Sequence, residues 1–236
     1  MVDRGDVIPV RRRLAMVLLV TSSLLLPLGA HADQPCDVVS MPCTFEGLPF
    51  KLKVVDADTH QPVADVHALA EWRMEGVGGR ANGPLMAKDT VSGSDGLISF
   101  EAWGPIEGPW TGLVIGSDPV VTLFKTGYKA LVLNNGYLPP GRERERVRRF
   151  VRKDSTHALE PFRGTPEEWL KELQRVYAGR ALSRSDDQSL KFRVPYSNRL
   201  KLISNERDKT PADERRVGRF FWHVDRELKF LEEGHR

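Results

Sequence analysis

The sequence has few of the residue patterns from which enzymes build catalytic and metal sites. It contains two cysteines and six histidines in 236 residues. It has no His-Glu-x-x-His pair, no Gly-x-Ser-x-Gly elbow and no glycine loop that leads into a phosphate-binding helix. Asp56, Asp58 and Asp95 lack the spacing and the distal glutamate of a calcium loop. The sequence therefore predicts no catalytic residue, no metal ligand and no cofactor, although an enzyme of unknown reaction stays an alternative.

The chain also lacks long hydrophobic runs, except for one near its beginning. A basic Arg-Arg-Arg segment precedes an apolar run over residues 14–28, and a small-residue Ala-His-Ala site ends at Ala32. This order is typical of a secretory signal peptide, and the run is shorter than a membrane-spanning helix requires. We expect residues 1–32 to be cleaved after Ala32, and the mature chain to begin at Asp33 in the periplasm or outside the cell. A retained membrane anchor is the weaker alternative.

The mature chain would have almost no net charge. Residues 1–32 hold four of the 35 basic and two of the 32 acidic side chains, which leaves 31 and 30 and a net charge of +1. A balance this close to zero gives no electrostatic reason to expect a nucleic acid as partner.

Both cysteines, Cys36 and Cys43, lie just past the predicted cleavage site. In an exported protein an isolated pair is most often a disulfide. We expect a Cys36–Cys43 bond, which would constrain the unfolded chain and stabilise the fold by about 2–3 kcal/mol in the chain-entropy model. A redox or metal pair is the alternative, but no histidine of the mature chain lies close by in sequence.

Alternating apolar and polar residues indicate short strands between residues 50 and 135. Phe50, Leu52 and Val54 alternate with Lys51 and Lys53, which is the period of a strand with one face in water. No helical period separates the strands, so the pattern predicts an antiparallel β-sandwich of about seven strands. The expected strands cover residues 50–54, 66–73, 97–103, 120–124 and 129–133, with weaker candidates at 85–90 and 113–116.

The histidines are not grouped as metal ligands. His67 and Glu71 are expected at outward positions of their strand, too far apart to bind one ion easily. His157 and His223 have acidic neighbours in sequence but no second histidine on the same helical face. We expect these side chains to be solvated.

Four segments have the order and spacing of a known domain. They read VVDADT at residues 54–59, QPVADV at 61–66, SDGLISF at 94–100 and KTGYK at 125–129. This order resembles the carboxypeptidase regulatory-like domain, a transthyretin-like or prealbumin-like fold. The resemblance implies a seven-stranded Greek-key β-sandwich with an accessory role. Between a polar loop and a strand, Gly96 is expected to take a positive φ in a tight turn.

A basic segment follows the predicted sandwich. Residues 141–153 contain seven basic and two acidic side chains. Such a surplus would suit an anionic partner, for example a phospholipid head group or an acidic polysaccharide. The alternative is a charged strand or connector whose arginine stems cover apolar surface.

Two amphipathic helices are expected in the C-terminal part. The first opens with a Thr-Pro-Glu-Glu capping box at residues 165–168, and the second is expected over residues 210–234. Alternation around residues 190–202 predicts a hairpin between them. Because neither apolar face can stay in water, we expect the second helix to pack on the first or on the sandwich flank through Phe220, Phe221 and Val224.

The predicted domain organisation has five parts. They are the signal peptide (1–32), a disulfide-pinned segment (33–47), the β-sandwich (48–140), a basic connector (141–164) and a helical extension (165–236).

We therefore expect an exported, non-catalytic interaction or structural module of the bacterial envelope, with an envelope protein or a polysaccharide as partner. The alternative is a carbohydrate-binding module, in which Trp103, Trp110 and Tyr137 near loops would stack on sugar rings. Placement of these aromatic residues in the core is the competing prediction.

Overall fold

The computed structural model describes eight stretches of the chain. These are residue 36 and residues 43–76, 81–108, 112–114, 118–136, 145–177, 191–210 and 219–233. The predicted signal peptide, and with it the predicted cleavage site after Ala32, lies outside the described residues.

The strands of the described stretches form two three-stranded sheets and one five-stranded sheet. One small sheet has the order β10-β1-β6, with β1 at Thr44–Gly47, β6 at Trp103–Glu107 and β10 at Val147–Arg148. The other has the order β11-β2-β5, with β2 at Phe50–Asp56, β5 at Leu97–Phe100 and β11 at Ser155–Leu159. The five-stranded sheet contains β3 (His67–Gly76), β4 (Ala81–Val91), β7 (Gly112–Val114), β8 (Val120–Phe124) and β9 (Leu131–Leu133).

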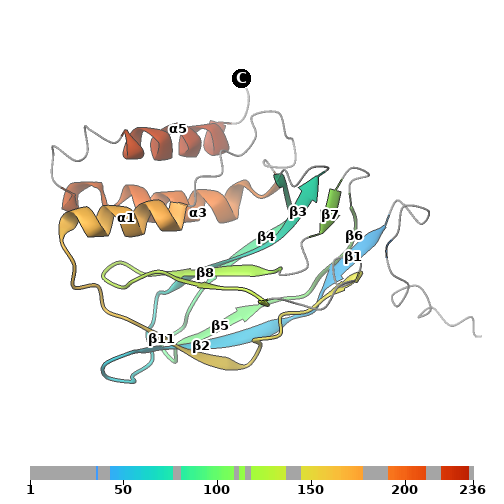
Figure 1. Ribbon diagram of the computed structural model, residues 1–236, viewed down its shortest axis with the longest axis horizontal. Coiled ribbons are helices and arrows are strands. Elements are labelled where there is room, and N and C mark those ends of the chain that lie inside the picture. Colours follow the sequence, from blue (N-terminus) through green and yellow to red (C-terminus); the bar gives the residue numbers. More distant parts are fainter. Residues whose placement is uncertain are drawn as a thin grey trace, which may run out of the picture. The chain divides into compact units, whose positions relative to one another are not determined.

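The core lies between the small sheets and the five-stranded sheet, so the protein is mainly β with a sandwich arrangement (Figure 1). Strand β2 places alternate residues in this core, as the period of two predicts. Phe50 of β2 meets Trp72 of β3 edge to face, with ring centroids 6.4 Å apart. Phe50 also stacks on Phe100 and packs against Phe150, both at 4.8 Å.

The structure has more strands than the seven expected, and two pairs are parallel rather than antiparallel. The segment expected to be a connector supplies β10 and β11, which pair in parallel with β1 and β2. Pairing between segments about 100 residues apart leaves no local signal in the sequence. The expected strand at residues 97–103 is instead two strands, β5 and β6, which belong to different sheets.

The turn predicted before β5 is present. Gly96 has a φ of 73°, and the N–H of Leu97 donates to the Asp95 carboxylate over 2.9 Å. A Cβ at Gly96 would come within 2.3 Å of the backbone oxygen of Val54. Both the backbone angle and the contact with β2 therefore require glycine here.

Helices cover the outer face of the five-stranded sheet (Figure 1). They are α1 at Pro166–Tyr177, α3 at Arg193–Ser204, the short 3₁₀ helix η2 at Arg207–Lys209 and α5 at Phe220–Glu233. The capping box predicted for α1 is formed, because Thr165 N–H donates to Glu168 over 2.8 Å and Glu168 N–H donates to Thr165 Oγ over 3.2 Å.

Two predictions for this region were wrong. The segment expected to be a hairpin is helix α3. The last helix, α5, begins at Phe220 directly after Arg219, whose φ is 49°, so the structure does not have one continuous helix over residues 210–234. The predicted start at Thr210 is not tested, because residues 211–218 lie outside the described stretches.

The predicted packing of the helical extension is confirmed. Phe220, Phe221 and Val224 of α5 share one apolar cluster with Trp169 of α1 and with Phe124 of β8. The helices and the sheet are thus joined by a second core.

Glu206 adds a polar link inside this second core. Its side chain is buried, with 1% of the residue exposed. One carboxylate oxygen accepts from Thr126 Oγ over 2.5 Å and from Lys209 Nζ over 3.0 Å, and the other accepts from Trp169 Nε1 over 3.2 Å. This single side chain connects the β8–β9 turn, α1 and η2.

Candidate functional site

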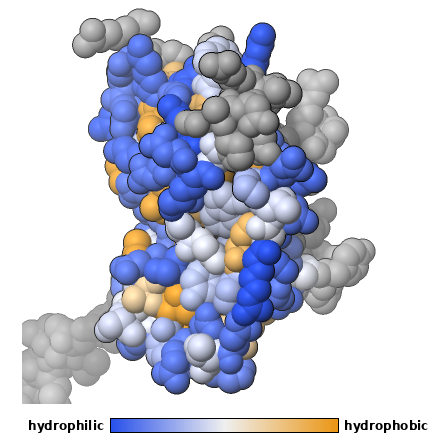
Figure 2. Space-filling view, turned by 90° about the vertical axis from the view of Figure 1, so that its left-hand side faces the viewer, coloured by the Kyte–Doolittle hydropathy of each residue, from blue (hydrophilic) through white to orange (hydrophobic). Residues whose placement is uncertain are grey.

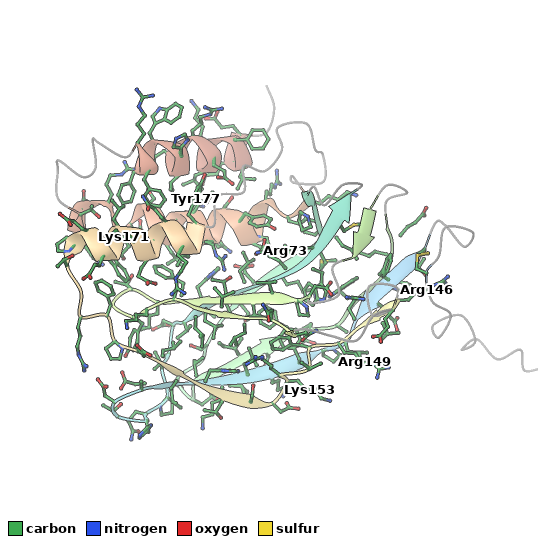
Figure 3. All side chains as sticks on the ribbon, viewed as in Figure 1. Arg73, Arg146, Arg149, Lys153, Lys171 and Tyr177 are labelled. Carbon is green, nitrogen blue, oxygen red and sulfur yellow. A yellow bond between two sulfur atoms is a disulfide. The ribbon has the colours of Figure 1, made fainter. Side chains whose placement is uncertain are left out.

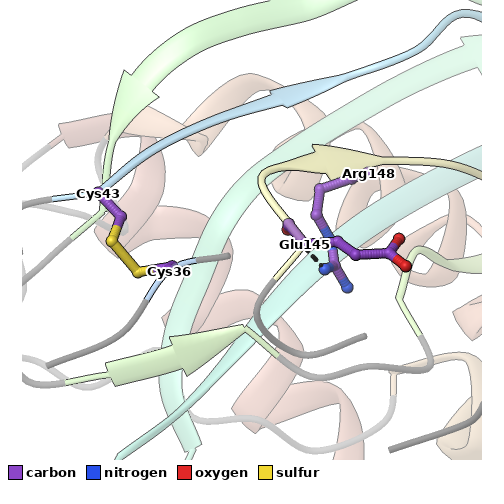
Figure 4. The surroundings of a disulfide bond; sticks show 4 residues. All are labelled: Cys36, Cys43, Glu145 and Arg148. Atoms are coloured by element: carbon purple, nitrogen blue, oxygen red, sulfur yellow. Dashed lines mark hydrogen bonds between the residues drawn. A yellow bond between two sulfur atoms is a disulfide. The ribbon is translucent and has the colours of Figure 1, made fainter. Parts of the chain in front are cut away.

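The predicted disulfide is present at the start of the described chain (Figure 4). Cys36 and Cys43 are bonded, with Cα atoms 5.9 Å apart, and both are buried. Cys43 lies directly before β1, so the bond ties residue 36 to the sheet.

The aromatic residues proposed for ligand stacking are not brought together on a described surface. Trp103 is buried with 6% of the residue exposed, and its ring packs edge to face on Trp72 at 5.2 Å. This packing leaves no free ring face for a sugar. Trp110 and Tyr137 lie outside the described residues.

The basic segment is fixed to the sandwich by a buried ion pair. Arg148 of β10 donates from its guanidinium to Oδ1 of Asp118, and both side chains are nearly inaccessible, at 3% and 0% exposure. Arg148 also donates to the carbonyl of Glu145 over 3.0 Å (Figure 4). Burial raises the pKa of Asp118 to about 6, although the charge of Arg148 acts in the opposite direction.

Asn135 holds the same segment from a second side. Its amide nitrogen donates to the carbonyls of Asp118 and Arg149 over 2.6 and 2.8 Å, and its amide oxygen accepts from Val151 N–H over 2.9 Å. In this part of the connector, the arginine stem and the backbone therefore have structural roles.

Other cations of the connector remain exposed and lie beside β2. Arg149 and Lys153 are exposed, and Figure 3 shows both near the lower small sheet. The N–H of Asp154 donates to the carbonyl of Lys51 over 2.7 Å, which places Lys153 beside β2 near Lys51.

The two lysines of β2 extend this surface. Lys51 and Lys53 are exposed on the outer face of the sheet, opposite the core positions of the same strand. We call Lys51, Lys53, Arg149 and Lys153 the basic face. Among the residues that the structure describes, none forms a hydrogen bond or ion pair with these four side chains. The alternation in β2 revealed the lysines, but the parallel pairing that adds the connector's cations to them was not visible in the sequence.

A second group of charged residues lies buried between the five-stranded sheet and α3. Glu71 of β3 accepts from Tyr196 Oη over 2.9 Å and from Arg73 over 2.9 Å. Arg199 of α3 donates to the carbonyl of Thr122 over 3.2 Å. The expectation that His67 and Glu71 are solvated was wrong, because their outward face is covered by α3 and they are only 3% and 7% exposed.

His67 belongs to the same interface. Its Nε2 lies 3.2 Å from Oδ2 of Asp89, which also accepts from the amide of Asn198 over 2.8 Å. Burial lowers the pKa of His67, and the hydrogen bond to Asp89 offsets this only in part. The histidine is therefore neutral near pH 7, and Asn198 and Asp89 join α3 to β4.

The charges of this buried group compensate one another. Burial raises the pKa of Glu71, but the positive charges of Arg73 and Arg199 outweigh it, and the resulting pKa lies below its ordinary value. Burial and the nearby Glu71 raise the pKa of Tyr196 well above its ordinary value. Glu71 is thus an anion held by two cations and a phenol, an arrangement that fixes α3 on the sheet.

A hollow of about 590 Å³ lies where the start of α1 meets the end of the sandwich. Two ion pairs line it, Lys129 with Glu160 at 2.8 Å and Arg163 with Asp58. Lys171 of α1, labelled in Figure 3, adds a further charge. The hollow is open to solvent, and Pro161 and Phe162 add apolar surface to its charged lining.

The end of the molecule seen in Figure 2 shows hydrophobic residues as small patches separated by hydrophilic ones. Within the described ranges, no three histidine, cysteine or acidic side chains are grouped closely enough to hold a metal ion. No helix in these ranges is long and apolar enough to cross a membrane.

Comparison with known proteins gave no family. No protein-family model matches the chain. No curated protein matches it either. The carboxypeptidase regulatory-like resemblance therefore stays a prediction.

Three solved structures show weak similarity. The 3-chlorocatechol 1,2-dioxygenase from Rhodococcus opacus 1CP has 15% identity and a TM-score of 0.30, over 52% of this chain and 62% of that one. The pilus 2b backbone protein of group B streptococcus has 12% identity and a TM-score of 0.23, over 49% and 41%. The 9R-lipoxygenase from Cyanothece PCC8801 has 11% identity and a TM-score of 0.23, over 85% and 31%. The chain thus spans less than two thirds of each protein, and scores this low carry no argument about fold or function.

Proposed function

We propose that this protein is an exported, non-catalytic binding module of the bacterial envelope. The observation that carries the proposal is the Cys36–Cys43 disulfide, which follows a sequence with the pattern of a cleavable signal. Structural disulfides persist in oxidising compartments and are rare in the cytosol. We further propose that the sandwich has the Greek-key connectivity of the carboxypeptidase regulatory-like family.

The roles of the buried charged residues support a binding module over an enzyme. Perturbed ionisable groups often mark active sites, but structural ion-pair networks perturb them as well. Here Glu71, Tyr196 and Arg199 bind one another or the backbone across the interface of α3 with the sheet. Arg148 and Asp118 attach the connector to the sandwich in the same way. Each of these buried charged groups therefore has a structural partner that accounts for its burial.

The experiment that tests export is fractionation of cells that express the full chain. We expect the protein in the periplasm or the medium, shortened to begin at Asp33. A variant with Leu18→Arg and Leu25→Arg would interrupt the apolar run and should remain in the cytosol at full length. Wild-type protein that stays full length in the cytosol would contradict the proposal.

A further inference from the structure

We propose that the basic face is a binding surface for a linear acidic polysaccharide, with Lys51 and Lys53 at its centre. The inference deepens the proposed function, because it names the partner class of an exported binding module. Its physical basis is the convergence of four unpaired cations from two segments that are about 100 residues apart in sequence.

The charges of the basic face come from β2 and from the connector beside it. Lys51 and Lys53 are two residues apart on one strand, so both project from the same face of the sheet, about 7 Å apart. Lys153 lies beside Lys51 through the backbone bond from Asp154, and Arg149 lies further along the connector. The result is a group of exposed positive charges around β2 and the connector beside it.

The charges of the basic face are not neutralised by acidic groups of the described chain, unlike other cations of the protein. The connector's buried cation, Arg148, has Asp118 as partner, and cations elsewhere pair with acids, such as Lys129 with Glu160. The four side chains of the basic face have no such partner within the described chain. Asp154 is an exposed acidic residue nearby, but the basic face has four cations for this one acid. An external polyanion would supply the missing negative charge.

The groups around the lysines favour a polysaccharide over a membrane as the partner. In the sheet, Lys51 lies opposite Ser99, and Lys53 lies next to Thr156 of β11. Hydroxyl groups beside cations suit a partner that carries both hydroxyl and acidic groups. Peripheral membrane binding usually inserts the apolar face of an amphipathic helix. The basic face is instead a sheet surface with separate apolar side chains such as Leu97, so the polysaccharide is the better fit.

The test uses the exported protein, purified with its disulfide, and alginate oligosaccharides as a polyuronate probe. Isothermal titration at roughly 0.05 M and roughly 0.3 M salt should show binding that weakens strongly as salt screens the charges. Neutral dextran should not bind. The variant Lys51→Gln/Lys53→Gln should weaken alginate binding by about 25-fold, since each of the two cations contributes on the order of a fivefold gain near an anionic surface.

A matched control removes two charges elsewhere. Lys171→Gln/Lys229→Gln changes exposed lysines of α1 and α5, and it should leave alginate affinity within about twofold. A second variant, Arg149→Gln/Lys153→Gln, should weaken binding as the first does and serves if the first fails to fold.

Three results would overturn the inference. They are no alginate binding at low salt, an equal loss in the control variant, or binding to phosphatidylglycerol vesicles without binding to alginate. The two proposals can fail separately. A protein that reaches the periplasm but does not bind alginate would contradict only the proposed polysaccharide partner, and not export. A cytosolic protein that binds alginate would instead contradict the envelope role.

Discussion

The ion pair between Arg148 and Asp118 offers a sharp test of how the connector is attached. In the variant Arg148→Met, the apolar stem is largely kept and the charge is lost. The carboxylate of Asp118, which is fully inaccessible, would then remain buried without its cationic partner. Removing one partner of a buried pair typically costs 3–5 kcal/mol, so we expect a loss of about 3 kcal/mol or more in the free energy of unfolding.

The loss of stability in Arg148→Met should depend on pH, because the Asp118 carboxyl group titrates. The pKa of Asp118 is raised to about 6 by burial, partly against the effect of Arg148. Without Arg148 the pKa should rise further. A carboxyl group whose pKa is raised by folding contributes stability at low pH that is lost as the pH rises through the folded pKa. The deficit of the variant relative to the wild type should therefore grow from pH 6 to pH 8.

The assay is urea unfolding followed by tryptophan fluorescence at pH 6, 7 and 8, with two comparison variants. Arg149→Met changes the exposed neighbour and should alter stability by less than about 0.5 kcal/mol. Arg148→Met/Asp118→Asn removes both charges and should recover part of the loss. If Arg148→Met unfolds within about 1 kcal/mol of the wild type, with no larger deficit at pH 8, the connector is not anchored by this pair.

Two further substitutions test the turn and the helical layer. In thermal unfolding, Gly96→Val should destabilise the protein by at least about 1 kcal/mol more than Gly127→Val. Both glycines have a positive φ, but only at Gly96 would an added Cβ contact the backbone. Equal losses in the two variants would mean that backbone strain, and not the contact with β2, causes the destabilisation. Glu206→Ala should cost about 2 kcal/mol in urea unfolding, because it leaves the buried Trp169 N–H without its acceptor. Lys209→Ala removes only an exposed partner of the same carboxylate and should cost much less.

Local features of the chain could be predicted from the sequence because the interactions behind them are local. The alternation in β2, the capping box of α1 and the positive φ of Gly96 each depend on a few neighbouring residues. The disulfide could be predicted because the two cysteines had no other partners.

Helix α3 was mistaken for a hairpin for a different reason. The helix lies between the sheet and α5, and its buried residues include Ser197 and Arg199 as well as Leu200 and Ile203. A helix that is covered on two sides does not show one apolar stripe. Polar residues such as Asn198 and Arg199 bond to groups on the sheet, so they resembled the exposed positions of a loop.

Only part of the basic face could be predicted from the sequence. Lys51 and Lys53 were identified on a wet strand face, and the charge surplus of residues 141–153 was evident from composition. That Arg148 turns inward while Arg149 remains exposed depends on the parallel pairing of β10 and β11 with distant strands. Long-range register of this kind has no signature in a single sequence.

The central claim is that the folded module is exported and enters an oxidising compartment. Intact mass spectrometry of the protein isolated from its host, treated with iodoacetamide but no reductant, tests it most directly. We predict a chain that begins at Asp33 and carries no alkyl group, with a mass lower by two hydrogen atoms than that of the reduced form. A chain that retains residues 1–32, or one in which Cys36 and Cys43 are both alkylated, would contradict the account.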